Sequence, residues 1–271
     1  MKPITEKEFN QLVDIIKSKY GVNLLNKKAL VIGRLQNYTE QNGFKSFSEY
    51  LAYVLTDKTG RALTTLINKV TTNHTFFMRE AEHFSFFQNK VLPYLEATES
   101  AKKDLRIWSA GCSTGEEPYT LAMIVDEHFG LEKNLWDTII LATDISTKVL
   151  ETACNGVYPN ELIEVLPQKW KNNYFVRVNE ENSKIISRLK DDVIFKKFNL
   201  MQDIFPFRRK FHVIFCRNVM IYFDLTTRTE LVNKFYEFME QGGYLFIGHS
   251  ESLNREETRF KYILPAVYRK E

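Results

Sequence analysis

Two glutamates that follow a glycine-rich turn have types and spacing that could do chemistry. The segment Ala110-Gly-Cys-Ser-Thr-Gly115 ends an apolar run, and Glu116 and Glu117 open the helix predicted next. Glycines let a backbone approach a ligand closely at the carboxyl edge of a doubly wound sheet. The GxxxG spacing is not GxGxxG, and a pyrophosphate would need a helix N-terminus free of carboxylates. These two carboxylates could hold a cationic amino group, although stabilisation of the helix dipole also explains them.

Other polar residues follow later apolar runs, at positions where parallel strands would end. Asp144 lies where nucleoside-binding folds hydrogen-bond a ribose diol. A ribose contact without a phosphate site favours S-adenosylmethionine over a nicotinamide dinucleotide, whereas capping of the next helix explains Asp144 equally well. Arg217, Asn218 and Tyr222 follow another apolar run. Three polar groups there exceed what a turn requires.

A polar segment around two phenylalanines precedes all of these residues. The stretch Thr71-Thr-Asn-His-Thr75 leads directly into Phe76, Phe77, Met78 and Arg79. A helix-packing face would hide the phenylalanines and make no use of the polar side chains, whereas a ligand site would use both. The segment is therefore a second candidate for ligand contacts.

The elements that would position these residues begin at Leu105, where short apolar runs start to alternate with helical segments. This alternation predicts an α/β fold with a parallel sheet and helices on both faces. Between Asp144 and Asn199, two strand-like runs flank the turn 179–182 and predict a β-hairpin near 172–192. An edge ornament and a docking element both explain this hairpin. The predicted strands are 105–111, 138–144, 193–200, 211–216, 243–248 and 262–270, and the predicted helices are 116–129, one from 147 and one near 226–240.

Residues 1–70 have the pattern of a small all-helical module. Thr5 with Glu8, and Ser46 with Glu49, are capping-box signatures ahead of apolar residues at helical spacing. The module contains eleven lysines and arginines against six acidic residues. Such a charge balance indicates an acidic partner, although a solvated basic face explains it as well.

Composition and cysteine usage exclude several classes of protein. The chain has 271 residues, which favours two units, and 44% of them are hydrophobic, enough for a packed core. The three cysteines are far apart and form no CxxC pair, which argues against a disulfide framework or a zinc knuckle. The N-terminus carries no apolar signal core, and no run approaches a membrane span. We expect a cytoplasmic protein without direct membrane insertion.

Several of these motifs, taken together and in this order, resemble one known family. TTNHTFFMRE, WSAGCSTGEEPYTLAM, ATDIS, the NL of FNLMQD, FCRNVMIYF and GGYLFIGHSES are similar to the chemotaxis receptor glutamate O-methyltransferases, CheR. The resemblance covers almost the whole chain. It implies a class I Rossmann-like methyltransferase sheet with an N-terminal all-helical domain and a small inserted β-hairpin subdomain. It also implies S-adenosylmethionine as donor, S-adenosylhomocysteine as product, and glutamates in the cytoplasmic domain of a chemoreceptor as acceptors.

The resemblance divides the chain and assigns roles to its residues. Residues 1–72 would be the basic, receptor-docking domain, 73–104 a linker that contributes to the cofactor site, and 105–271 the cofactor-binding domain. Arg79 and Tyr222 would be catalytic, with Tyr222 beside the transferring methyl group. The residues that would bind the cofactor are Asn73, Thr75, Arg79, Glu116, Glu117, Asp144, Asn199, Leu200, Arg217 and Asn218.

This sequence departs from the family pattern at two places. Phe76-Phe77-Met78-Arg79 stands where a small residue and two phenylalanines more often precede the arginine. The hairpin is shorter and lacks the glycines of members that tether to a receptor's C-terminal pentapeptide. We therefore expect a pentapeptide-independent member.

The expected reaction needs neither a general base nor a metal. A glutamate carboxylate, with an ordinary pKa of about 4.3, is already ionised near neutral pH, so proximity, alignment and exclusion of water suffice. No metal is expected, because the histidines show no ligand spacing. These are His74, His83, His128, His212 and His249.

Three other functions remain as alternatives. A nucleic-acid methyltransferase would share the fold and cofactor, but the chain lacks a DPPY-like motif and a Pro-Cys loop, so no nucleic acid is expected as partner. A non-catalytic sensor could have kept the pocket. An NAD-dependent enzyme is disfavoured by the glycine spacing.

Overall fold

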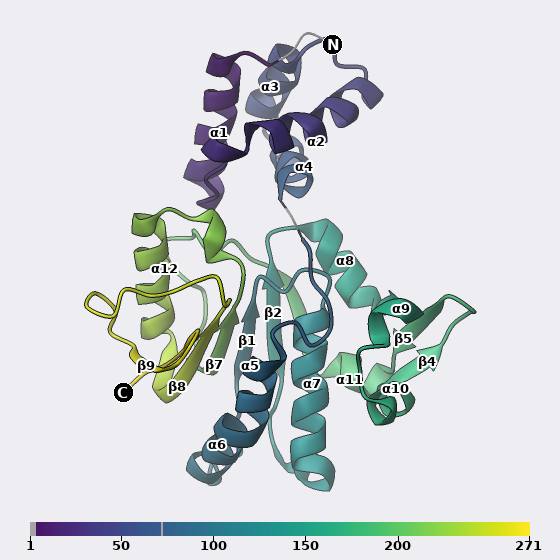
Figure 1. Cartoon of the computed structure of the whole chain (residues 1–271), viewed down its shortest axis with the longest axis vertical. Coiled ribbons are helices and arrows are strands. Elements are labelled where there is room, and N and C mark those ends of the chain that lie inside the picture. The colour runs from purple at the N-terminus through teal and green to yellow at the C-terminus, as the bar shows by residue number, and fades with distance from the viewer. Residues whose placement is uncertain (1–3, 72) are drawn as a thin grey trace. The chain divides into compact units, whose positions relative to one another are not determined.

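The computed structural model describes residues 4–71 and 73–271, and its chain divides into two compact units. The first unit contains Met1–Thr72 together with Tyr222–Arg228, and the second contains Asn73–Ile221 and Thr229–Glu271. Figure 1 shows the helices of the first unit and the central sheet of the second.

The first unit is helical, and its helices begin where the sequence places their caps. Thr5 and Glu8 form the predicted capping box, and Gly21 ends the first helix with φ +72°, a left-handed conformation that glycine adopts without strain. Apolar residues from four helices form its core, as Leu12, Leu35 and Leu66 illustrate. The helices are α1 (Glu6–Tyr20), η1 (Leu25–Lys27), α2 (Lys28–Gln41), α3 (Phe47–Thr56) and α4 (Arg61–Val70).

The second unit is built on a seven-stranded sheet with the order β6-β2-β1-β7-β8-β10-β9. The first five strands in this order pair in parallel, as predicted, while β10 runs antiparallel to both β8 and β9. The predicted terminal strand 262–270 is therefore wrong in one respect, because a turn at Ala266, with φ +63°, splits it into a hairpin. The strands are β1 (Ile107–Ala110), β2 (Ile140–Asp144), β6 (Val193–Lys197), β7 (Phe211–Cys216), β8 (Met239–Ile247), β9 (Lys261–Leu264) and β10 (Val267–Arg269).

Neighbouring residues of β1 pack on opposite faces of the sheet. Ile107 is part of the core cluster with Phe84, Phe87 and residues of α7, whereas the ring of Trp108 packs against that of Phe235 on α12. Helices therefore cover both faces, as predicted. The helices of this unit outside the insertion are α5 (Ala81–Phe86), the π-helical turn η2 (Phe87–Val91), α6 (Leu92–Thr98), α7 (Glu116–Phe129), η3 (Gly130–Leu135) and α8 (Thr147–Asn155), and parts of η4 (Met220–Tyr222) and α12 (Leu225–Glu237) also belong to it.

The predicted hairpin is present, and it belongs to a larger inserted subdomain. Strands β4 (Phe175–Arg177) and β5 (Asn182–Ile185) pair antiparallel around the turn, and β3 (Val157–Pro159) adds a third strand on the other side of β5. In Figure 1 this insertion lies beside α7 and α8. Three short helices complete it, namely α9 (Asn160–Ile163), α10 (Gln168–Tyr174) and α11 (Ser187–Asp191).

The strand order differs from that of a dinucleotide-binding fold. Numbered along the chain, the seven strands run 3-2-1-4-5-7-6, whereas the dinucleotide order is 3-2-1-4-5-6. The chain reverses direction across the sheet between β1 and β7, and ligands of doubly wound folds bind at such a switch point, outside the carboxyl ends of the strands. This arrangement is the predicted class I Rossmann-like methyltransferase sheet. Over residues 4–71 and 73–271, no helix combines the length and apolar character needed to cross a membrane.

Candidate active site

The loop between β1 and α7 is pressed against the loop after β7. Gly111 has φ +95°, and a Cβ built on it would lie 2.4 Å from Cγ2 of Val219. The Cβ of any other residue would collide with that side chain, so glycine is required here for contact between two loops. This differs from the sequence-based interpretation, in which the glycine served close approach to a ligand. The contact places Ser113 and Asn218, which both have positive φ values, at the same edge of the sheet.

The two glutamates that open α7 have different partners. Glu117 accepts a hydrogen bond from the Ser109 hydroxyl at 2.7 Å and lies 3.2 Å from Nη1 of Arg217. Glu116 is buried, and both of its carboxylate oxygens accept from the Thr114 hydroxyl, at 2.9 and 2.7 Å. The structure therefore brings Glu117 to the switch point and gives Glu116 a local contact within the β1–α7 loop.

Arg217 joins the carboxyl ends of β1 and β7 to the segment that precedes α5. Its side chain is only 2% exposed and lies 3.2 Å from the carboxylates of both Glu80 and Glu117. It also donates to the backbone carbonyl of Arg79. Two carboxylates around one guanidinium leave one negative charge, which suits a cationic ligand group.

The two carboxylates beside Arg217 respond differently to their surroundings. For Glu117, burial outweighs the guanidinium and raises the carboxyl pKa above its ordinary value. For Glu80, burial also acts to raise the pKa, but Arg217 and the hydrogen bond from Asn218 outweigh it, so this pKa is lowered. Glu80 is therefore the more firmly ionised partner of Arg217.

Asp144 connects the ends of β1 and β2. One carboxylate oxygen accepts from the Ser113 backbone N–H at 3.0 Å, and the other accepts from the Ser146 N–H at 2.8 Å. The helix after β2 is capped by the hydroxyl of Ser146, which accepts from Val149, so Asp144 is not its capping side chain. The Ile145 N–H is a further backbone donor to this carboxylate, and a carboxylate offers about four acceptor sites, so it can accept from another donor as well. Burial raises the pKa of this carboxyl.

The segment 73–80 runs along the β1–α7 loop. The backbone carbonyl of Asn73 accepts from the Ser113 hydroxyl at 3.1 Å. The Arg79 guanidinium donates to the carbonyl of His74 at 2.8 Å and lies over the ring of Phe76, with its central carbon 6.0 Å from the ring centroid. The two phenylalanines have separate roles, because Phe77 is fully buried and Phe76 is 40% exposed.

The buried ring of Phe77 anchors this segment to the inserted subdomain. It packs edge-on against the rings of Tyr158 and Phe175, with centroids 5.0 and 5.8 Å away. Edge-to-face packing of this kind adds about 0.5–1.5 kcal/mol beyond burial of the ring area. The insertion therefore supports the segment that carries Asn73, Thr75 and Arg79.

Comparison with known proteins identifies the family. Residues 7–71 match the CheR methyltransferase all-alpha domain, and residues 73–268 match the CheR methyltransferase SAM binding domain. The chain belongs to the CheR methyltransferase family. The description of its second domain gives S-adenosylmethionine as the ligand, and the names of its relatives give methylation in chemotaxis as the activity of the family.

Similar curated proteins align with the chain over nearly its whole length. The chemotaxis protein methyltransferase of Borreliella burgdorferi is 44% identical, over 98% of this chain and 95% of that protein. The probable chemotaxis protein methyltransferase of Rhizobium etli is 36% identical over 89% and 91%. The Escherichia coli chemotaxis protein methyltransferase is 33% identical over 98% and 91%.

The remaining predicted CheR site residues occupy two places. Asn199 and Leu200 follow β6, where the Asn199 side chain accepts from the Met201 N–H at 3.1 Å and Leu200 is buried. Tyr222 falls in the first unit, where Lys27 lies over its ring at 4.4 Å. The catalytic role of Tyr222 stays a prediction, as does cofactor binding by the other residues.

Sequence reasoning missed Glu251. This buried carboxylate accepts backbone N–H groups from three residues, Gly248 at 2.6 Å, Asn218 at 3.1 Å and Ile221 at 3.0 Å. It thereby ties the end of β8 to the loop after β7. The signal available in the sequence was an acid three residues after Gly248, at the end of an apolar strand, which was interpreted only as a loop.

Glu80 was also missed, and it lies next to two histidines that are far apart in sequence. Ligand-type atoms of Glu80, His83 and His249 lie within 4.8 Å of one another. The spacing of histidines in the sequence gave no indication of this group. Glu80 already accepts from Arg217 and from Asn218, and a cation there would compete with the Arg217 guanidinium. We assign no metal to the group.

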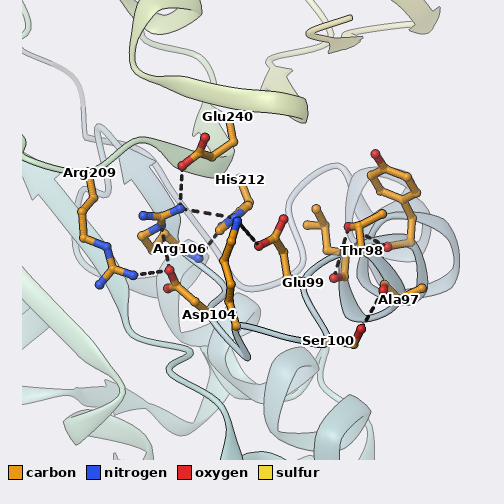
Figure 2. Close-up of polar contacts among 12 residues, drawn as sticks. Ala97, Thr98, Glu99, Ser100, Asp104, Arg106, Arg209, His212 and Glu240 are labelled. Carbon is orange, nitrogen blue, oxygen red and sulfur yellow. Dashed lines mark hydrogen bonds and ion pairs between the residues drawn. The ribbon is translucent and has the colours of Figure 1, made fainter.

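Figure 2 shows a second polar cluster, which contains Arg106, His212, Asp104 and Glu240. His212 Nδ1 accepts from the Arg106 N–H at 3.0 Å, and the Arg106 guanidinium lies 2.7 Å from Glu240 and 3.5 Å from Asp104. Arg106 and His212 stand at the start of β1 and β7. Because ligands of this fold bind at the carboxyl edge, we interpret the cluster as a structural cross-link.

We predict that the free energy of unfolding depends on pH because His83 is buried. Burial, followed by the charge of Arg217, lowers its pKa from 6.5 to about 4, while Glu80 acts in the opposite direction and His249 faces the ring. The unfolded chain then binds a proton between pH 6.5 and 4 that the folded protein does not. The stability of the wild-type protein should fall by about 3 kcal/mol as the pH is lowered through this window.

Urea unfolding between pH 7 and pH 4 tests this expectation. His83→Gln removes the titrating group, so its stability curve should be flatter than that of the wild-type protein in this window. Parallel curves for the two proteins would show that His83 does not contribute.

Proposed function

We propose that this CheR-family protein transfers a methyl group from S-adenosylmethionine to glutamate carboxylates of chemoreceptor cytoplasmic domains, forming methyl esters. The proposal places the reaction in the cytoplasm. The observation that carries it is the buried Glu80–Arg217–Glu117 set, which lies with Asp144 at the carboxyl ends of the strands in a SAM binding domain. Methyl-ester formation at these glutamates would adapt the chemotaxis signal.

The residues at this edge fit the chemistry of the proposed donor. Asp144 can still accept from a ribose hydroxyl, and the surplus negative charge around Arg217 suits the α-amino group of the methionine end. Asn199 and Leu200, after the neighbouring strand β6, would flank the adenine. Bound there, S-adenosylmethionine supplies an electrophilic methyl group on a sulfonium.

The proposed acceptor needs no activation by the chain. A glutamate with an ordinary pKa of about 4.3 is ionised at neutral pH, so the protein has to orient it and exclude water. In this proposal Arg79 orients the acceptor carboxylate and Tyr222 positions the methyl group. Neither residue acts as a general base in this proposal.

Cysteine chemistry at the carboxyl ends of the strands is disfavoured by the state of the two cysteines there. Cys112 and Cys216, which flank the carboxyl ends of β1 and β7, are fully buried, and burial raises the pKa of both thiols. A protonated thiol is a poor nucleophile. This disfavours the alternative of a nucleic-acid methyltransferase that uses a catalytic cysteine.

The basic first unit is the proposed receptor-docking domain, but several of its lysines have internal partners. Lys17 forms an ion pair with Asp224 at 2.8 Å, and Lys27 lies over Tyr222. Substituting these lysines would disturb the unit itself as well as docking. Lys45 and Lys58 are exposed and are therefore better positions for testing attraction to an acidic receptor surface.

A methylation assay tests the proposed function. The purified protein is incubated with S-adenosylmethionine labelled in its methyl group and with a chemoreceptor cytoplasmic fragment. We expect label on the fragment that mild base releases as methanol, the behaviour of a methyl ester. A fragment in which the candidate glutamates are changed to alanine is the control. Base-stable label, or transfer to nucleic acid instead, would contradict the proposal.

A further inference from the structure

We propose that Glu80 is a positioning residue for the methyl donor. Its carboxylate fixes Arg217 and Asn218 at the end of β7 in the arrangement that receives the methionine end of S-adenosylmethionine. The inference rests on the proposed function and adds a residue that neither the sequence motifs nor the family comparison assigned.

Glu80 contacts both residues that follow β7 and lie at the switch point. One of its oxygens is 3.2 Å from Nη2 and 3.4 Å from Nε of Arg217, and the other accepts from Nδ2 of Asn218 at 3.2 Å. Its side chain is only 13% exposed. A carboxylate that accepts from two nitrogens of a guanidinium and from an amide fixes the orientation of the guanidinium and of the amide.

The backbone on both sides of this contact is left-handed. Met78 and Glu80 have φ values of +61° and +56°, which such residues rarely adopt, and Asn218 has φ +58°, which asparagine tolerates better. Such conformations cost energy and persist only where the surrounding structure imposes them, often at functional sites. In particular, Gly248 lies so close that a Cβ on it would be 2.5 Å from Nδ2 of Asn218. Asn218 therefore has little freedom to find another partner for its amide.

The charge of Glu80 determines the net charge of the group formed by Glu80, Arg217 and Glu117. With Glu117 alone, Arg217 would form a neutral pair, and its guanidinium would be free to turn toward Glu117. Glu80 holds Arg217 from the other side and adds the surplus negative charge that a cationic α-amino group requires. Removing this charge should therefore weaken donor binding even when the fold is intact.

A purely structural role for Glu80 predicts different results. If Glu80 only held the segment 73–80 in place, its substitution would reduce the fraction of folded protein. Turnover per mole of total protein would then fall, while the affinity of the folded fraction for the donor would be unchanged. A positioning role instead raises the Kd and the KM for the donor in protein that is fully folded.

Glu80→Gln tests the inference, because it keeps the shape and removes the charge. Glu82→Gln is the matched control, because Glu82 is an exposed residue at the start of α5. The measurements are the Kd for S-adenosylhomocysteine by calorimetry, the KM and kcat for S-adenosylmethionine, and the urea midpoint. We expect Glu80→Gln to weaken binding and raise the KM by about tenfold to hundredfold, as for a lost charged hydrogen bond. Glu82→Gln should match the wild-type protein.

Either of two results would overturn the inference. One is a Glu80→Gln variant with the wild-type Kd and KM. The other is a loss of turnover that follows the unfolded fraction, with the KM unchanged. If the wild-type protein itself bound no S-adenosylhomocysteine, the proposed function would fail as well, which distinguishes that outcome from failure of the inference alone.

Discussion

Arg217→Ala is expected to abolish measurable methyl transfer and to lower the free energy of unfolding by about 3–5 kcal/mol. The substitution leaves the buried carboxylates of Glu80 and Glu117 without their shared cation, and breaking a buried ion pair from one side carries a cost of this size. It also removes the donor to the Arg79 carbonyl. Urea unfolding and calorimetry with S-adenosylhomocysteine measure the two effects.

Arg217→Lys separates the two effects. Lysine keeps the positive charge but cannot reach both carboxylates in the fixed geometry of a guanidinium. We therefore expect it to recover most of the stability and little of the cofactor affinity. Arg208→Ala, at an exposed position, is the control and should change neither. Near-normal cofactor affinity in Arg217→Ala would contradict the proposed site.

The second large effect is expected for Asp144→Asn, which should weaken binding of S-adenosylhomocysteine by about tenfold to hundredfold. The asparagine can still accept from Ser146, but its amide group faces the Ser113 N–H, where the wild-type carboxylate accepts. It also removes the charged acceptor proposed for the ribose hydroxyls. The kcat at saturating cofactor should fall much less than kcat/KM.

The exposed Asp203 provides a control for this substitution. Asp203→Asn should bind the cofactor like the wild-type protein. A fall in kcat with an unchanged KM in Asp144→Asn would mean that Asp144 acts elsewhere in the reaction and not through the ribose.

Much of the fold could be predicted because its local signals agree with its tertiary structure. Neighbouring residues encode the capping box at Thr5 and the glycine that ends helix α1, Gly21. The same holds for strand β7, in which every residue is buried. The division of the C-terminal apolar segment into strands β9 and β10 could not be predicted from neighbouring residues. The apolar residues continue through Ala266, and only the left-handed backbone at that residue makes the turn. The third strand of the insertion, β3, was missed because three residues are too few to show a period.

The candidate site was predictable where a residue ends a strand, since strand ends converge at one edge of a parallel sheet. Asp144, Arg217 and Asn218 were found by this reasoning. Glu80 and Glu251 were not, because each has partners that lie thirty or more residues away in sequence. Cofactor binding by Glu116 stays a prediction: its position beside Glu117 suggests a shared role, and in the structure its carboxylate accepts from the Thr114 hydroxyl.

Calorimetric titration of the wild-type protein with S-adenosylhomocysteine and S-adenosylmethionine, with NADH as control, tests the central claim most directly. We predict saturable binding of both adenosyl ligands at one site per chain and no binding of NADH, because carboxylates occupy the helix start that a pyrophosphate would need. Binding of NADH, or no binding of either adenosyl ligand, would contradict the site described here.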